Sequence, residues 1–298
     1  VRQPRGGHQR YLVYLSIRYI ISALPAHHVP REVPARVLAS APRVQRPQLR
    51  LAADARDGED VRLRDVTTAY AVLAIAGPAS PRLLGEVMDV DISDDAFPAY
   101  RMRHAHIGHA PVFAQRLSFT GETGWEIFVT PDFAEHVLEV ILEAGQPFDL
   151  RLAGGEALNA LRIEKGYLHW GADMAYTEAP HQMGLDFICK PDRHRPFIGQ
   201  DPYLVHRADR QGPYLCSVRL TDPDAMLHHN EPVLRDGRII GFVTSGAFSA
   251  AHNAAVGLCL VSPPEGSGGP EGIEEGEFAV MVEGREVPAE LQRKPFLG

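Results

Sequence analysis

Two carboxylates in the stretch SFTGETGWEIFV, residues 118–129, have a type and spacing that could do chemistry. Glu122 lies between two glycines, whereas Glu126 follows within an apolar run. A carboxylate among aromatic side chains is stable only where donors reach its oxygens. Two adjacent N–H groups of a planar heterocycle would match it, and so would a guanidinium of this chain, such as that of Arg116 or Arg162. On these residues alone, ligand binding and an internal salt bridge both stay open.

A predicted β-hairpin positions Glu126. Residues 110–119 read as one strand and residues 125–129 as the next, with a turn that contains two glycines between them. Side chains alternate between the faces of a strand, so Glu126 lies on the opposite face from Trp125. Phe119, at the end of the first strand, is expected close to Glu126. The carboxylate is therefore expected among aromatic side chains.

The residues around this hairpin predict a further strand and three helices. Residues 71–76 read as a strand, and Ser80 is expected as the N-cap of the short helix that follows. Residues 131–145 carry apolar side chains at three- and four-residue spacing, which is typical of a helix packed on a sheet. A third helix is expected to stop at Gly166. Its buried side is assigned to Ala157, Leu158, Leu161 and Glu164.

The pattern changes after residues 200–212, where we place a domain boundary. From Tyr214 onward the chain shows short alternating strands, a hairpin turn at Asp236-Gly237 and no convincing helix. Residues 262–276 are rich in glycine, proline and glutamate and read as a loop. A small β-barrel or sandwich is the expected form of this part.

Charge and composition exclude several classes of protein. The chain has 298 residues, of which 45% are hydrophobic and 23% charged, as in a soluble globular protein of about two domains. Residues 1–50 carry nine arginines and one acid, whereas the remainder carries 21 basic and 37 acidic side chains. Such an acidic body is a poor partner for nucleic acid. Residues 1–50 also contain six prolines and are expected to be poorly ordered.

Membrane insertion and secretion are not expected. The apolar stretch 11–24 is shorter than a spanning helix, and Arg18 interrupts it. No clear cleavage site follows it, which speaks against a signal peptide. The cysteines, Cys189, Cys216 and Cys259, are far apart and are expected as buried thiols. The predicted location is the cytoplasm.

No metal site is predicted either. His104 and His106 share one face of a predicted strand and could hold a metal with a nearby carboxylate. Incidental histidines on an exposed strand are the preferred interpretation. GxSxG, HExxH and GxxxxGK[ST] patterns do not occur, which removes several hydrolase and phosphate-binding functions.

Longer motifs resemble one known family. The run RLSFTGETGWEIFV is followed by LRIEKGYLHWGADM, FIGQDPY, DGRIIGFVTSGAFS and AAVGLCLV. In order and approximate spacing, over residues 60–296, these resemble the aminomethyltransferase (glycine-cleavage T-protein) family. They most resemble the version that forms the C-terminal half of dimethylglycine and sarcosine dehydrogenases.

The resemblance implies an α+β fold: a T-protein-like folate-binding α/β domain, incomplete here, followed by a small C-terminal β-barrel. On this basis we divide the chain into three parts. Residues 1–52 are a basic, proline-rich segment without a match to the family. Residues 53–205 form the partial folate-binding domain, and residues 206–298 form the barrel.

The resemblance also implies a cofactor and a reaction. Members of the family bind tetrahydrofolate, and the acidic residue in the position of Glu126 pairs with the aminopyrimidinone edge of the pterin. Phe119, Trp125 and Tyr167 are candidate walls for the pterin ring, although relatives often carry tyrosine in place of Phe119. A one-carbon unit, carried as an iminium produced by demethylation, is then captured as 5,10-methylenetetrahydrofolate.

Two departures from the family leave the catalytic residues unassigned. Relatives have a longer region upstream of residue 71, with an aspartate that orients or deprotonates the reacting amine, and nothing around Asp54 or Asp65 matches that motif. No GxGxxG follows a strand near the start, so FAD is expected only from a flavoprotein partner chain. Three hypotheses result: a one-carbon transfer domain, a non-catalytic folate-binding relative, or a truncated product of a demethylating oxidoreductase.

Overall fold

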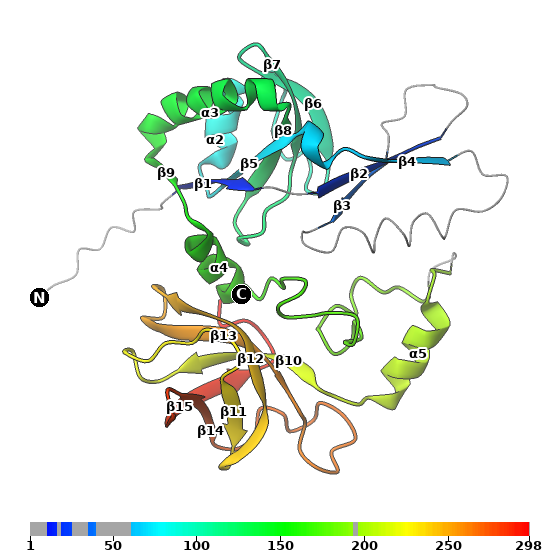
Figure 1. Ribbon diagram of the computed structural model, residues 1–298, viewed down its shortest axis with the longest axis vertical. Coiled ribbons are helices and arrows are strands. Elements are labelled where there is room, and N and C mark those ends of the chain that lie inside the picture. The colour runs from blue at the N-terminus through cyan, green and yellow to red at the C-terminus, as the bar shows by residue number, and fades with distance from the viewer. Residues whose placement is uncertain (1–10, 17–18, 26–34, 40–60, 193–195, 298) are drawn as a thin grey trace, which may run out of the picture. The chain divides into compact units, whose positions relative to one another are not determined.

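The computed structural model describes residues 11–16, 19–25, 35–39, 61–192 and 196–297 (Figure 1). The chain divides into two compact units. The first comprises Val1–Ser118 and Glu122–Gly154, and the second comprises Phe119–Gly121 and Gly155–Gly298. The domain boundaries placed at residues 52 and 205 from the sequence stay a prediction.

A six-stranded sheet forms the centre of the first unit. Its strands pair antiparallel except for β1 and β9, which are parallel. In the order of the sheet, they are β6 (Met102–Ile107), β7 (Ala110–Gln115), β8 (Gly124–Val129), β5 (Ala71–Ala76), β1 (Tyr11–Ser16) and β9 (Leu150–Leu152). The antiparallel pairing of β7 with β8 is the hairpin that the sequence predicted.

Three further strands form a separate antiparallel sheet in the order β3-β2-β4. They are β2 (Tyr19–Pro25), β3 (Ala35–Ala39) and β4 (Val61–Asp65). Strands β1, β2 and β3 therefore lie within residues 1–52, where the sequence predicted poor order. The apolar stretch 11–24 of the sequence therefore holds parts of two short strands, β1 and β2. The rest of that segment lies outside the described residues.

Two helices cover one face of the six-stranded sheet (Figure 1). They are α2 (Ser80–Val87) and α3 (Pro131–Gly145), and short 3-10 turns occur at Thr67–Ala69 and Gln146–Phe148. Leu84 of α2 and Ile141 of α3 are buried in the same apolar core as Trp125 and Ile127 of β8. The predicted amphipathic character of α3 is therefore confirmed.

The start of α2 differs from the prediction. Ala79 occupies the N-cap position, and Ser80 is the first helical residue. The Ser80 hydroxyl donates to the Gly77 carbonyl at 2.6 Å and lies 3.0 Å from the Thr123 carbonyl. A buried serine that bonds backward to the preceding loop cannot also cap the helix, which is why the capping prediction was wrong by one residue.

The second unit contains a closed six-stranded barrel and two helices. The helices are α4 (Gly155–Glu164) and α5 (Gln200–Asp209). In barrel order the strands are β10 (Tyr214–Leu220), β13 (Ala254–Val261), β12 (Arg238–Ser249), β11 (Pro232–Arg235), β14 (Phe278–Val282) and β15 (Arg285–Gln292). The barrel that the sequence predicted is confirmed.

The buried side of α4 differs from the prediction. Glu164 is buried as predicted, but the other buried residues are Arg162 and Ile163, whereas Ala157 is exposed. The helix packs on β12 and β13 of the barrel through this side. A rule that counts apolar spacing treats arginine as exposed, so it could not place Arg162 on a face that is buried through polar contacts.

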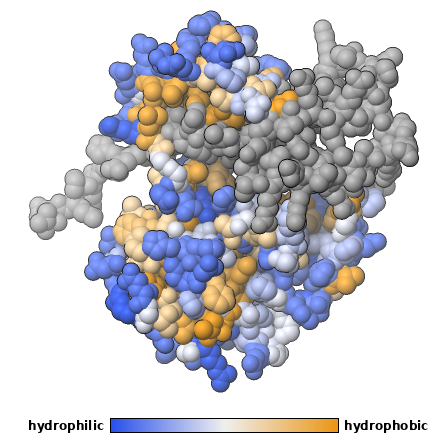
Figure 2. Space-filling model, viewed as in Figure 1, coloured by the Kyte–Doolittle hydropathy of each residue, from blue (hydrophilic) through white to orange (hydrophobic). Residues whose placement is uncertain are grey.

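The visible surface is mixed in character. Figure 2 shows hydrophobic areas interspersed with hydrophilic ones on the face that it draws. Among the described helices, none combines the length and the apolar character needed to cross a membrane.

Candidate functional site

Glu126 lies in the middle of β8, between β5 and β7. In the ladder it is opposite Ala74 on one side and Gln115 on the other, and its side chain is 1% exposed. Trp125 lies in the core beneath α2 and α3, whereas Phe128 belongs to a separate apolar cluster on the opposite face. The predicted alternation along this strand is therefore confirmed, and Glu126 shares its face with Phe128.

The neighbours of Glu126 on this face are an alanine and an amide. Side chains directly opposite in an antiparallel pair have Cβ atoms about 4.5–5.5 Å apart. Ala74 is small, and Gln115 presents a side-chain oxygen, Oε1, that is buried and accepts no hydrogen bond from the described residues. The face thus offers a carboxylate and a carbonyl oxygen side by side, which suits a ligand that carries several N–H donors.

Both arginines proposed as internal partners of Glu126 have aspartate partners. Arg116 lies 2.6 Å from the Asp94 carboxylate, and its guanidinium packs 5.2 Å from the centre of the Trp125 ring. Arg162 forms an ion pair with Asp173. Each of these two arginines therefore has an aspartate as its counter-charge.

Trp125 lies in the interior. Its side chain is 0% exposed, and its ring lies 6.4 Å from that of Phe97 in an edge-to-face arrangement. A strand pattern predicts the face of a residue but not its depth in the molecule. The position of Trp125 identifies it as a core residue and not as a wall for a ligand.

Phe119 and Tyr167 belong to the second unit, where their rings meet edge to face at 6.3 Å. The ring of His169 lies 6.4 Å from that of Phe119, and Tyr167 is 42% exposed. Gly121 has a φ of +74°, and a Cβ there would lie 2.5 Å from Cγ of Lys165, so this close approach requires glycine. The two candidate ring walls are therefore brought together in an aromatic cluster that also includes His169.

The expected place of Phe119 was nevertheless wrong. β7 ends at Gln115, so Phe119 is not the last residue of the strand that pairs with Glu126. Residues 119–121 belong to a different compact unit from the flanking chain. The chain therefore leaves the sheet four residues earlier than the alternation of the sequence suggested.

A buried polar network holds the helix that precedes Tyr167. Arg162 donates to Asn159 at 2.9 Å, to the Tyr167 carbonyl at 3.1 Å and to the Ser245 hydroxyl at 2.7 Å, besides its pair with Asp173. The side chains of the ion pair are 3% and 0% exposed. A buried guanidinium is stable when its donors are matched in this way.

The carboxylate of the pair is matched as well. Asp173 accepts from the Thr244 hydroxyl and from the His169 backbone N–H, each at 2.7 Å. The network therefore ties the turn that carries His169 to strand β12 of the barrel. The network could not be predicted from the sequence, because a single arginine inside a helix gives no sign of its burial.

The histidines of β6 and its turn have separate surroundings. His106 lies 2.9 Å from the Asp89 carboxylate, and hydrogen bonds from its backbone N–H and its ring lower the pKa of Asp89. His104 packs on an aromatic ring, and His109 stacks on His136 at 3.9 Å. Within the described residues, no group of three or more His, Cys, Asp or Glu side chains could hold a metal ion.

The fold is that of a glycine-cleavage aminomethyltransferase. A crystal structure of glycine cleavage system aminomethyltransferase T from Bartonella henselae matches with a TM-score of 0.78 over 97% of this chain and 87% of that one, at 18% identity. The GCVT N-terminal domain matches residues 37–193, and the glycine cleavage T-protein C-terminal barrel domain matches residues 214–297. The chain belongs to the aminomethyltransferase (glycine-cleavage T-protein) family.

The similar proteins include much longer chains. A 4-methylaminobutanoate oxidase (formaldehyde-forming) of Paenarthrobacter nicotinovorans is 34% identical over 80% of this chain and 28% of its own length. The mitochondrial dimethylglycine dehydrogenase of Rattus norvegicus is 32% identical over 81% and 28%. An aminomethyltransferase of Clostridium botulinum is 32% identical over 80% and 62%. The chain therefore spans less than a third of the two oxidoreductases, and the predicted relationship to demethylating dehydrogenases is confirmed.

Proposed function

We propose that this chain binds tetrahydrofolate through Glu126 and serves one-carbon transfer, in which a demethylation-derived iminium is captured as 5,10-methylenetetrahydrofolate. The observation that carries the proposal is a buried carboxylate in the middle of a strand whose flanking residues are apolar. Membership of the aminomethyltransferase family supports it. The proposal classes the chain as a folate-dependent transferase domain associated with an oxidoreductase.

The chemistry of the pterin supports the assignment. Its 2-amino group and ring N–H form a planar donor pair, which a carboxylate accepts with both oxygens. Such charge-assisted bonds offset the cost of burying Glu126. The buried Oε1 of Gln115, directly opposite in the ladder, adds one further acceptor for the amino group.

Phe119 and Tyr167 are proposed as apolar contacts of the pterin ring. Their edge-to-face pair presents aromatic surface, and Tyr167 is accessible. Phenylalanine lacks the hydroxyl that relatives often carry at position 119, so no phenolic hydrogen bond forms there. Trp125 is left out because it belongs to the core.

The iminium is proposed to come from a flavoprotein partner. The 298 residues contain no GxGxxG fingerprint near the start of the chain, and this chain contributes binding and orientation of the folate. No residue is assigned as acid or base. A non-catalytic folate-binding protein is the alternative, and the lack of the family's motif around Asp54 and Asp65 favours it.

Calorimetric titration with tetrahydrofolate tests the proposal on three proteins: the natural sequence, Glu126→Gln and Glu122→Gln. Glutamine keeps the shape of Glu126 but turns one acceptor into a donor that faces donors. We expect a loss of roughly 2–4 kcal/mol, or about 30- to 1,000-fold in affinity. Glu122→Gln, in the neighbouring turn, is the matched control and should bind nearly as well as the natural sequence.

Two outcomes contradict the proposal. Equal affinities for the natural sequence and Glu126→Gln, with unchanged circular dichroism spectra, would remove the ligand role of Glu126. Absence of binding by the natural sequence would overturn folate binding itself.

A further inference from the structure

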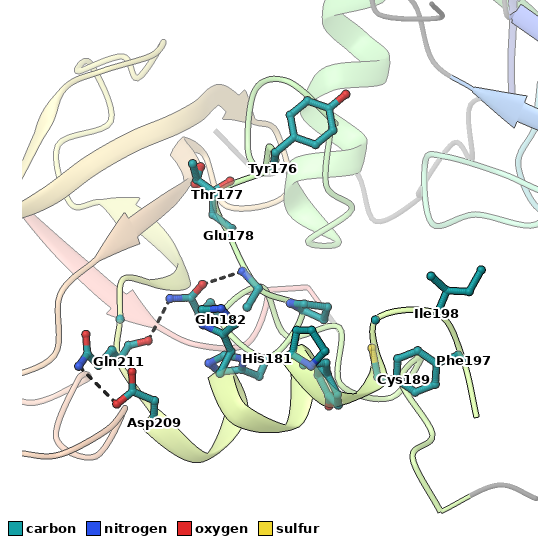
Figure 3. Close-up of a pocket in the computed structure, with 17 residues that line it drawn as sticks. Tyr176, Thr177, Glu178, His181, Gln182, Cys189, Phe197, Ile198, Asp209 and Gln211 are labelled. Atoms are coloured by element: carbon teal, nitrogen blue, oxygen red, sulfur yellow. Dashed lines mark hydrogen bonds between the residues drawn. The ribbon is translucent and has the colours of Figure 1, made fainter. Parts of the chain in front are cut away.

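The second unit contains a cavity of about 530 Å³, which is lined by the turn 176–182, by residues near Cys189 and by helix α5 (Figure 3). A volume of this order is typical of small-molecule sites. Figure 3 shows the polar side chains of Asp209 and Gln211 at one end, Phe197 and Cys189 at the other, and His181 between them. The cavity is therefore polar at one end and apolar at the other.

Most polar groups in the lining have partners within the protein. Gln182 accepts from one backbone N–H at 2.7 Å and donates to a backbone carbonyl at 2.9 Å. Glu178 accepts from a backbone N–H at 2.6 Å and from a hydroxyl at 2.5 Å. The Tyr203 hydroxyl donates to Asp186 at 2.7 Å. These bonds hold the walls of the cavity in place.

His181 is the exception. Both of its ring nitrogens are buried, and neither has a hydrogen-bond partner in the described part of the chain. Burial lowers the pKa of His181 below its usual 6.5, so the ring is neutral at pH 7. The imidazole therefore adds no positive charge to the lining of the cavity.

The charges of the lining are negative. Glu178 and Asp209 contribute carboxylates, and the described lining contains no lysine or arginine. The side-chain amide of Gln211 lies 3.4 Å from the Asp209 carboxylate, which is long for a hydrogen bond. The Asp209 carboxylate therefore stays largely available to a ligand. Just outside, Arg207 is 3.4 Å from Asp186, so these two charges offset each other.

The apolar end offers aromatic surface. The rings of Phe197 and Tyr203 lie 6.0 Å apart in a tilted arrangement. Aromatic rings pack against apolar groups, and carboxylates bind cations directly. We propose that this cavity binds a small organic cation, with its ammonium group toward Asp209 and its apolar body against Phe197.

This site is separate from the one proposed for folate. It uses neither Glu126 nor Phe119, and a ligand with carboxylates, such as a folate, is disfavoured by the negative lining. Either proposal can therefore fail without the other.

Cys189 provides a reporter inside the cavity. The chain has three cysteines, and the other two, Cys216 and Cys259, are 0% exposed in the barrel. Burial raises the pKa of Cys216 to about 12 and that of Cys259 well above its usual value. Burial also raises the pKa of Cys189, but this thiol is only partly buried. Alkylation of the folded chain by neutral iodoacetamide should therefore mark Cys189 first, as read by peptide mass spectrometry.

The test uses the full chain and three probes with the same ring but different charge: benzylammonium, benzyl alcohol and benzoate. If Cys189 reacts only while the cavity is empty, the probe lowers the alkylation rate by a factor equal to one plus the ratio of probe concentration to Kd. We expect benzylammonium at about four times its Kd to slow alkylation about fivefold, benzyl alcohol to protect less and benzoate not to protect. Equal protection by all three probes, or by none, would overturn the proposal.

Two variants on α5 complete the test. Asp209→Asn removes a carboxylate of the lining and should raise the Kd of benzylammonium at least about threefold. Asp201→Asn changes an exposed aspartate at the other end of the same helix, outside the cavity, and should leave the Kd unchanged. An unchanged Kd in Asp209→Asn, or an equal change in both variants, contradicts the proposed site.

Discussion

At the scale of single residues, polar side chains account for the least predictable features of this protein. Arg162 and Asp173 are buried together, and each has further hydrogen-bond partners. The pair links α4 to the turn before residue 174 and, through Ser245 and Thr244, to the barrel. Breaking this pair should therefore cost more free energy of unfolding than breaking an exposed ion pair of similar geometry.

Asp173→Asn should lower the free energy of unfolding by about 3–5 kcal/mol, because it leaves the Arg162 guanidinium buried without its counter-charge. Urea denaturation measures this loss. The matched control is Asp149→Asn: Asp149 pairs with Arg151 at 2.5 Å but is half exposed, and asparagine tolerates its φ of +53°. The control should change stability by less than about 1 kcal/mol. Equal effects of both substitutions would show that burial of the pair does not matter.

Alternation explains how much of the Glu126 site the sequence could predict. The period of two placed Glu126 and Phe128 on one face correctly, and the same period in β7 would have placed Gln115 beside Glu126. The pattern could not show that Trp125 is fully buried, because burial depends on the helices above it. It could not find the end of β7 before Phe119 either.

At the scale of elements, periodic segments were predicted well and polar ones poorly. β5 and α3 have the bounds expected from their apolar patterns. Helix α5 was missed because it contains Pro202 and buries only Tyr203, so it has no apolar stripe. The face of α4 was misplaced because its burial depends on hydrogen bonds.

Strand β12 depends on a glycine where two backbones approach. A Cβ on Gly241 would lie 1.9 Å from the carbonyl oxygen of Leu260 in β13. Because the colliding atom belongs to the backbone of a paired strand, it cannot move aside as the end of a flexible side chain could. We expect Gly241→Ala to lower the free energy of unfolding by at least about 3 kcal/mol. Opening of the barrel would then make Cys216 and Cys259 reactive toward iodoacetamide under conditions where the natural sequence protects them.

Gly154→Ala is the control for that substitution. A Cβ on Gly154 meets nothing within 4 Å, so stability should change by less than about 0.5 kcal/mol. A Gly241→Ala variant as stable as Gly154→Ala would contradict the close approach of β12 and β13.

At the scale of the whole molecule, the length of the chain and its sequence motifs bear on whether it can oxidise a substrate by itself. The chain spans 28% of the length of the rat dimethylglycine dehydrogenase and lacks a dinucleotide fingerprint in its own sequence. We expect the purified 298-residue chain to be colourless and to oxidise neither sarcosine nor dimethylglycine unless a flavoprotein is added. A yellow preparation with stoichiometric flavin contradicts this expectation.

The central claim is that the Glu126 carboxylate pairs with the 2-amino group of the pterin, and a thermodynamic cycle between protein and ligand tests it most directly. Calorimetry compares tetrahydrofolate and its 2-desamino analogue, each on the natural sequence and on Glu126→Gln. If the two groups pair, removing either should weaken binding, while removing both should cost little more than removing one, with a coupling of about 1–3 kcal/mol. Losses that add without coupling would contradict the account, because Glu126 and the amino group would then act independently.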